Sequence, residues 1–171
     1  MLFTALALPL SVLLASAFAG FPPTPPVPGS WAWPARGPVI NAFDPPDSPF
    51  GAGHRGIDIA VPVGTSILAP ESGSVSFAGR VGGHLFITID HGGELQSTYS
   101  WLSAISVRRG DLVARNQVIG TTGIGHPGSA IPHLHFGVRL AGSYVDPLDY
   151  LEPQGVVDLI RLTSLAARSA G

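Results

Sequence analysis

The stretch PHLHFGV, residues 132–138, decides how this chain folds, because it places two histidines one residue apart in a run typical of a β-strand. Successive side chains of a strand point to opposite faces. His133 and His135 therefore project together, while Leu134, Phe136 and Val138 supply packing. Two imidazoles aimed at one point indicate a metal site or a proton-transfer site. A lone His-x-His pair also occurs without any function, so its partners must be sought elsewhere in the chain.

Composition limits what those partners can be. The chain has 171 residues, about one domain, with 45% hydrophobic residues, 12% charged residues and a net charge of −2. No broad basic surface exists, so nucleic-acid binding is not expected. All nine basic residues are arginine, and cysteine is absent. The chain can therefore form neither thiolate ligands nor disulfides, and any metal must be held by histidine and carboxylate.

The chain is rich in turn-forming residues, with 22 glycines and 17 prolines, and it shows little helical periodicity. Short apolar segments alternate with glycine turns, which predicts an all-β domain with an antiparallel sheet folded back on itself and few or no helices in its core. The expected strands are residues 38–43, 66–69, 73–78, 85–90, 95–102, 112–113 and 117–120, and residues 144–151 are expected to close the sheet.

Four parts of the chain are expected. Residues 1–19 are apolar and end in A-x-A patterns, which predicts a signal peptide, cleavage and export. No Lys or Arg precedes this run, so a retained membrane anchor is the alternative. Residues 20–36 are a proline-rich linker, whose Trp31 and Trp33 could dock on the domain. The folded domain follows at 37–152, and the tail at 153–171 receives no function.

A second pair of metal-binding residue types lies upstream. His54 and Asp58 are four residues apart in the sequence HRGID, so in an extended conformation they share one face. A catalytic zinc site uses three protein ligands and leaves its fourth position open. His54, Asp58 and His135 would supply two imidazoles and one carboxylate, a set that suits Zn²⁺.

Several motifs together resemble one family, the lysostaphin-type or LytM-like zinc metallopeptidases. The resemblance runs from about residue 37 to 151, and the tryptophan–proline start with arginine as the only base is similar to exported actinobacterial members. The motifs are GHRGIDIA at 53–60, GT at 64–65, GSV at 73–75, DHG at 90–92, GDLV at 110–113 with QVIG at 117–120, and PHLHF at 132–136.

The resemblance implies a function and a set of site residues. It implies a β-sheet groove that binds peptidoglycan peptides, with zinc held by His54, Asp58 and His135. His133 would be the catalytic histidine that orients or deprotonates the attacking water. The expected protein is then a secreted or cell-wall zinc endopeptidase in cell-wall remodelling, monomeric and free of the membrane after signal cleavage.

One position departs from the family. Relatives carry a second catalytic histidine in a Tyr-x-His-Leu strand, where this chain has Trp101. The indole has a single polar group, a donor, and cannot accept a proton. Losing such a group costs on the order of 10²- to 10⁴-fold in rate. His126, in the glycine-rich loop 123–130, could replace it, as could His84 or His91; otherwise His126 is an exposed loop residue.

Two alternatives follow from these residues. The first is a degenerate zinc-binding module that binds cell wall or regulates another wall hydrolase without cleaving; Trp101 favours it and the retained ligands oppose it. The second is a lipoyl or biotinyl carrier domain, which the GDLV and QVIG segments also resemble. Carrier domains need an acceptor lysine, and the chain has none, so the carrier function is excluded.

Overall fold

Antiparallel β-strands make up nearly all of the regular structure. The computed structural model describes residues 27–48 and 51–154, so the expected signal peptide and all but the first two residues of the expected tail lie outside the described residues. The all-β prediction is confirmed. The strands are β1 Val39–Asn41, β2 Ile57–Ala60, β3 Ser66–Leu68, β4 Gly73–Val81, β5 His84–Asp90, β6 Leu95–Ile105, β7 Leu112–Val113, β8 Val118–Thr122, β9 His133–Leu140 and β10 Ser143–Val145, followed by a 3-10 turn at Pro147–Asp149.

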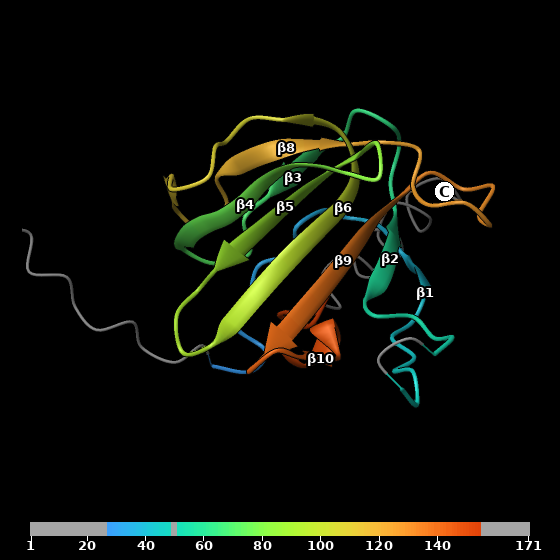
Figure 1. Ribbon diagram of the computed structural model, residues 1–171, viewed down its shortest axis with the longest axis horizontal. Coiled ribbons are helices and arrows are strands. Elements are labelled where there is room, and N and C mark those ends of the chain that lie inside the picture. Colours follow the sequence, from blue (N-terminus) through green and yellow to red (C-terminus); the bar gives the residue numbers. More distant parts are fainter. Residues whose placement is uncertain (1–26, 49–50, 155–171) are drawn as a thin grey trace, which may run out of the picture.

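The strands form one branched sheet in the order β1-β2-β9-β6-β5-β4-β7. The branch lies on β6, which pairs with β9 as far as Ser100 and with β8 from Leu102 onward. Trp101 stands at this branch and is also the extra residue of a β-bulge against β5. Figure 1 shows β4, β5, β6 and β9 side by side, with β3 and β8 at their upper end.

One face of the long strands forms the hydrophobic core. Leu134, Phe136 and Val138 of β9 are completely buried, as the alternation of the PHLHFGV stretch predicts. Ile57 and Ile59 of β2 join them in the same core cluster. The residues between them, Asp58 on β2 and His133 and His135 on β9, point to the opposite face because side chains alternate along a strand.

The register of β2 and β9 sets up the candidate site. Asp58 lies directly opposite His135 in this antiparallel pair. Side chains of directly opposed residues have Cβ atoms about 5 Å apart, so the carboxylate and the imidazole meet on one face. His54 lies before β2, in an isolated bridge with Asp44. The expected extended run from residue 54 to 60 is thus bent after His54, and β2 itself begins at Ile57.

Residues from the proline-rich stretch take part in the folded unit. Trp31 is fully buried in the core and forms a parallel bridge with Leu151. Its ring packs 4.6 Å from His91 and 5.4 Å from Tyr150. Trp33 donates its indole N–H to the Glu152 carbonyl at 2.8 Å. The fold therefore begins upstream of residue 37. Within the described residues, no helix has the length and hydrophobicity that crossing a membrane requires.

Candidate metal centre

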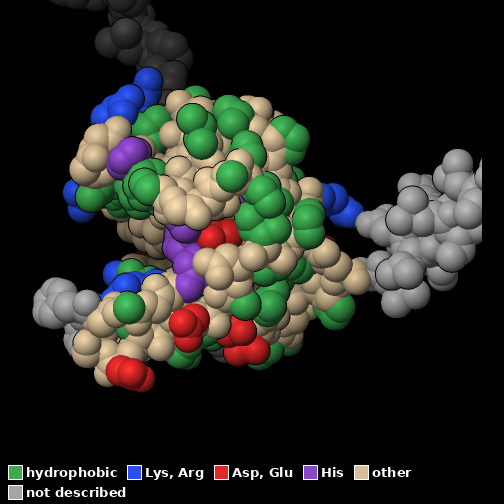
Figure 2. Space-filling view, turned by 90° about the vertical axis from the view of Figure 1, so that its right-hand side faces the viewer, with side chains coloured by type: hydrophobic (Ala, Val, Ile, Leu, Met, Phe, Trp, Pro, Cys, Tyr) green, Lys and Arg blue, Asp and Glu red, His purple; other side chains and the backbone are tan. Residues whose placement is uncertain are grey.

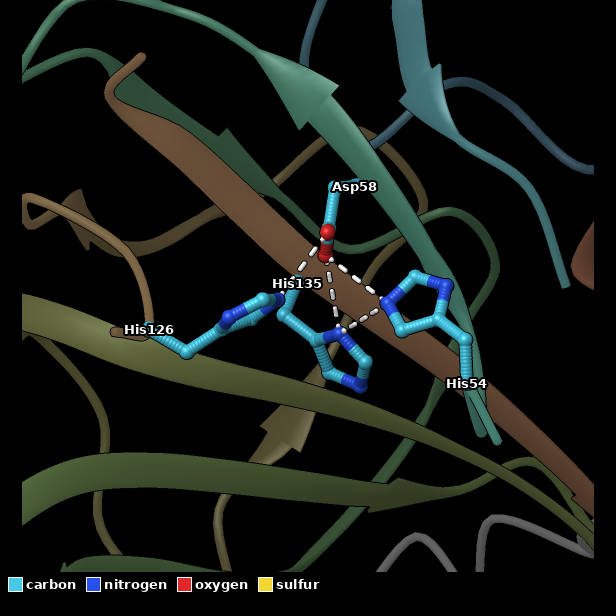
Figure 3. A group of neighbouring side chains, drawn as sticks. All are labelled: His54, Asp58, His126 and His135. Carbon is cyan, nitrogen blue, oxygen red and sulfur yellow. Dashed lines mark hydrogen bonds and ion pairs between the residues drawn. The ribbon is translucent and has the colours of Figure 1, made fainter. Parts of the chain in front are cut away.

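The three expected ligands converge on the face of the sheet opposite the core (Figure 3). Asp58 Oδ1 lies 2.9 Å from His135 Nδ1 and 3.1 Å from His54 Nε2. The two histidine nitrogens are themselves 3.1 Å apart. Donor atoms bound at about 2.0–2.2 Å to one tetrahedral ion would lie roughly 3.3 Å from one another. These three groups are therefore spaced as ligands of a single small cation.

A fourth side chain, that of His126, reaches the same point from the loop between β8 and β9. Its Nε2 lies 3.0 Å from Asp58 Oδ2. One ligand atom from each of the four residues falls within 4.8 Å of every other. The sequence suggested His126 only as a substitute for the missing histidine, because nothing in a glycine-rich loop predicts where its side chain points.

Backbone carbonyls determine which ring nitrogens carry protons. A carbonyl can only accept, so His54 Nδ1 donates to the Ala42 carbonyl at 2.7 Å and His126 Nδ1 donates to the Pro127 carbonyl at 3.0 Å. In the neutral rings, both Nε2 atoms then present lone pairs, and both face the carboxylate of Asp58. Such lone pairs can bind a proton or a metal ion, and carbonyls behind metal-bound histidines commonly fix the tautomer in this way.

Asp58 supplies the negative charge of the cluster. Its side chain is nearly inaccessible to solvent, and this burial raises the pKa of the carboxyl. The hydrogen bond from His135 and the charge interactions with His54, His135 and His126 outweigh burial and hold the pKa well below its usual range. Asp58 is therefore a carboxylate at neutral pH, which a metal ligand must be.

His133, the expected catalytic residue, lies behind the cluster instead of in it. It is completely buried, and its Nε2 is 3.9 Å from Asp58 Oδ1. Its Nδ1 donates to the Ile131 carbonyl at 2.8 Å, and its Nε2 accepts the backbone N–H of His126 at 3.2 Å. Both nitrogens are engaged within the protein, so the loop seals this imidazole from the solvent.

Trp101 occupies the wall of the groove, at the position where the family resemblance leads us to expect a second catalytic histidine. Its backbone has a φ of 64°, an uncommon value for a bulky residue. Its ring centroid lies 3.9 Å from that of His84, with the two rings tilted by 47°, and 6.3 Å from that of His126. His84 thus packs against the indole of Trp101. It is not one of the four residues whose ligand atoms converge.

His91 has a structural position. Its Nδ1 donates to the Ser72 carbonyl at 2.9 Å, and its Nε2 pairs with the Ser97 hydroxyl at 2.8 Å. The Ser97 hydroxyl in turn contacts the Tyr99 hydroxyl at 2.9 Å. Burial lowers the pKa of His91 below its ordinary value. This polar chain lies in the core, under the sheet, and takes no part in the metal cluster.

A groove of about 640 Å³ runs over the cluster. Its floor consists of residues from β4, β5, β6 and β9, including Phe77, Phe86, Thr98 and Gly137, and His54 and His126 border it. Arg139 also lines the groove; it donates to the Tyr144 hydroxyl, and its guanidinium lies 4.2 Å over that ring. Figure 2 shows histidine side chains at the bottom of a hollow flanked by hydrophobic side chains.

The donor set fits zinc. Imidazole nitrogens with one carboxylate and no sulfur are a common zinc ligand set, whereas calcium and magnesium prefer oxygen ligands throughout. Two of the three expected ligands also have a neighbour that orients them: the Ala42 carbonyl for His54, and the Asn41 amide at 3.3 Å for Asp58.

Sequence relatives match between 70% and 73% of this chain. An uncharacterized protein of Mycobacterium tuberculosis is 37% identical over 127 residues, which are 70% of this chain and 51% of that protein. An uncharacterized lipoprotein of Escherichia coli is 37% identical over 128 residues, or 73% and 48% of the two chains. The murein hydrolase activator NlpD of E. coli is 37% identical over 125 residues, or 71% and 31%. The chain thus spans about half or less of each relative's length.

Solved structures share the fold. A zinc-containing peptidase from Vibrio cholerae superposes with a TM-score of 0.63 at 27% identity, covering 72% of this chain and 41% of that one. The catalytic domain of the antimicrobial peptidase lysostaphin from Staphylococcus simulans superposes with a TM-score of 0.56 at 28% identity, covering 65% and 89%.

The expected family is confirmed by a family model. The model of peptidase family M23 matches residues 52–147, from just before His54 into the closing segment. That match spans all four residues of the cluster and more than half of the 171-residue chain. The protein therefore belongs to peptidase family M23.

Proposed function

We propose that this protein is an exported, zinc-dependent endopeptidase that cleaves peptidoglycan peptides. The single observation that carries the proposal is the convergence of His54, Asp58 and His135 within 2.9–3.1 Å of one another at the floor of an open groove. Zinc bound by these residues would act as a Lewis acid toward a peptide carbonyl and would make water more acidic. These three residues are the proposed ligands.

His133 is the proposed proton-transfer residue. Its Nδ1–H bond to the Ile131 carbonyl leaves the lone pair on Nε2, the nitrogen nearer Asp58. A neutral imidazole in this tautomer can accept a proton from an attacking water at Nε2 and return it to the leaving amine. The bond that Nε2 accepts from the His126 backbone would first have to break.

The groove suits an extended peptide. Its volume of about 640 Å³ lies in the range of small-ligand and peptide sites, and its floor mixes aromatic and hydroxyl side chains. Arg139, steadied by Tyr144, offers a guanidinium that matches a carboxylate on the substrate. The peptidoglycan substrate and the location outside the cytoplasm are supported by the relatives, which include a lipoprotein, a murein hydrolase activator and lysostaphin.

The test is metal content together with hydrolysis. We expect the purified protein to retain one zinc per chain and to release peptides from isolated cell walls, and we expect His133→Ala to keep the zinc but lose the release. Zinc-replete protein that releases nothing from walls or from any wall peptide, in the wild type and in variants that open the site, would contradict the endopeptidase.

A second function is favoured by Trp101 alone. Its indole stands where the family resemblance implies a histidine, and it lines the groove, where it could stack on a sugar or a peptide. The protein would then bind cell wall, or regulate another wall hydrolase, without cleaving. The relative NlpD is named for activating a murein hydrolase. Wall pull-down by a zinc-loaded protein that shows no turnover, lost in Trp101→Ala, would favour this function.

A further inference from the structure

We propose that His126 is a fourth protein ligand of the zinc, so that the centre is closed in this conformation and the loop 123–131 must move before a substrate can reach the metal. This inference rests on the proposed zinc centre. It gives His126 a role different from that of a replacement for the missing catalytic histidine.

The position of His126 is the first argument. Its Nε2 lies 3.0 Å from Asp58 Oδ2, whereas His54 and His135 contact Oδ1, and one ligand atom from each of the four residues falls within 4.8 Å of every other. Its ring centroid is 6.0 Å from that of His54 and 5.8 Å from that of His135, so all three imidazoles border the same carboxylate. In Figure 3 the ring of His126 approaches from the side opposite His54.

The orientation of the His126 ring is the second argument. Its Nδ1 lies against the Pro127 carbonyl, which can only accept, so Nε2 is the nitrogen directed at the buried Asp58 carboxylate. A contact of 3.0 Å between these two atoms needs a proton or a metal cation between them, and a zinc ion would bind both. A catalytic histidine that replaced the missing one would be directed at the substrate in the groove instead of at a ligand oxygen.

The loop is tied down at both sides of His126. Before it, the Gly123 N–H donates to the Trp101 carbonyl at 3.1 Å, and after it, the Ser129 hydroxyl donates to the Ile131 carbonyl at 3.1 Å. At His126 itself, the backbone N–H donates to His133. The imidazole is therefore held toward Asp58, although about a quarter of its side chain is exposed.

A four-ligand centre has a functional consequence. Zinc sites with four protein ligands are structural, whereas catalytic sites keep one position open. If His126 fills that position, the same loop also covers Nε2 of His133, so one movement would uncover both the metal and the proposed proton acceptor. Because the loop lies on the surface, this movement would leave the core intact.

The test measures zinc affinity by competition with a chelator in the purified full chain. We expect His126→Ala to weaken zinc binding by at least about tenfold, the lower limit for a residue that supports a metal site. The matched control is His84→Ala, which removes a histidine outside both the groove and the cluster and should leave zinc affinity unchanged. Thermal unfolding of the metal-free variants shows whether either substitution disturbs the fold.

Cobalt(II) provides a second measurement. Its visible absorption reports the number of ligands, and azide serves as a small anionic probe of an open position. We expect azide to change the spectrum of cobalt-loaded His126→Ala but not that of the wild type. An azide response of equal size in both proteins, together with equal zinc affinity, would overturn the fourth ligand and leave the three-ligand centre standing.

The remaining outcomes separate the two proposals. Unchanged zinc affinity with lost hydrolysis in His126→Ala would make His126 the second catalytic histidine, which contradicts the inference and supports the endopeptidase. Failure of the wild type and of both variants to bind zinc at all would remove the zinc centre, and with it the proposed function.

Discussion

Gly125 packs directly on the ring of His133. A Cβ atom at residue 125 would meet ring atoms Cε1 and Nε2 of His133 well inside van der Waals contact, at about 2.3 and 2.6 Å. The φ of Gly125 is 95°, a conformation that side chains other than glycine rarely adopt. Residue 125 is thus the point at which the loop is pressed against the buried imidazole.

Gly125→Ala is therefore expected to lift the loop without removing any imidazole. Zinc affinity should fall by the same amount that we expect for His126→Ala. Release of wall peptides should rise, because Nε2 of His133 is freed. The control is Gly128→Ala, which has a similar φ of 100° but meets no atom within 4 Å. Equal behaviour of the two alanine variants would show that backbone strain, and not the contact with His133, is responsible.

Asp58→Asn should abolish zinc binding while nearly preserving side-chain shape. Zinc at a hundred times its dissociation constant stabilises a folded protein by about 2.7 kcal/mol, and this increment should appear in the wild type but not in Asp58→Asn. Thermal or urea unfolding with and without zinc measures it. Asp47→Asn, which removes an exposed carboxylate, is the control. An equal zinc-dependent shift in Asp58→Asn would exclude Asp58 as a ligand.

Trp101→His should increase hydrolysis. It restores an imidazole at the groove wall, and the φ of 64° at this position is better tolerated by histidine than by tryptophan. One general acid–base group is worth on the order of 10²- to 10⁴-fold, so a gain of at least about tenfold is expected. The gain should be larger when the substitution is combined with Gly125→Ala.

Trp101→Phe is the matched control, since it changes the size of the ring but adds no proton acceptor. Initial rates of peptide release from isolated walls compare the three proteins. A gain of the same size in Trp101→Phe would attribute the effect to the shape of the groove.

The buried His91 makes stability depend on pH. Burial lowers its pKa in the folded protein below the ordinary value of 6.5, so the unfolded chain binds a proton more readily. The stabilisation is fully present above pH 6.5 and is lost as pH falls from there toward the folded pKa. Urea unfolding of metal-free protein at pH 7.5 and 5.5 should show this loss. His91→Gln should reduce the difference between the two pH values, and an unchanged difference would assign it to other groups.

Much of the fold was predictable because the strands are short, alternating and bounded by glycine. The expected segments at 85–90, 112–113 and 117–120 match β5, β7 and β8 to within one or two residues. Residues in the strands behave as the period of two requires: Leu134 and Phe136 are in the core, and His135 is on the other face.

The details of the site were less predictable because they depend on pairing between distant segments. Asp58 faces His135 only because β2 pairs with β9 in one particular register, 77 residues apart. The direction of His126 depends on loop hydrogen bonds, which follow no periodicity. Trp31 was placed in a linker because its neighbours are prolines, yet burial of its large ring makes it part of the core.

The bridge between Trp31 and Leu151 joins the first described part of the chain to the last. It sets the point where the chain enters the fold beside the point where it leaves, under the sheet and on the face away from the groove. Breaking this one bridge would therefore free the first and the last described segments of the folded unit together.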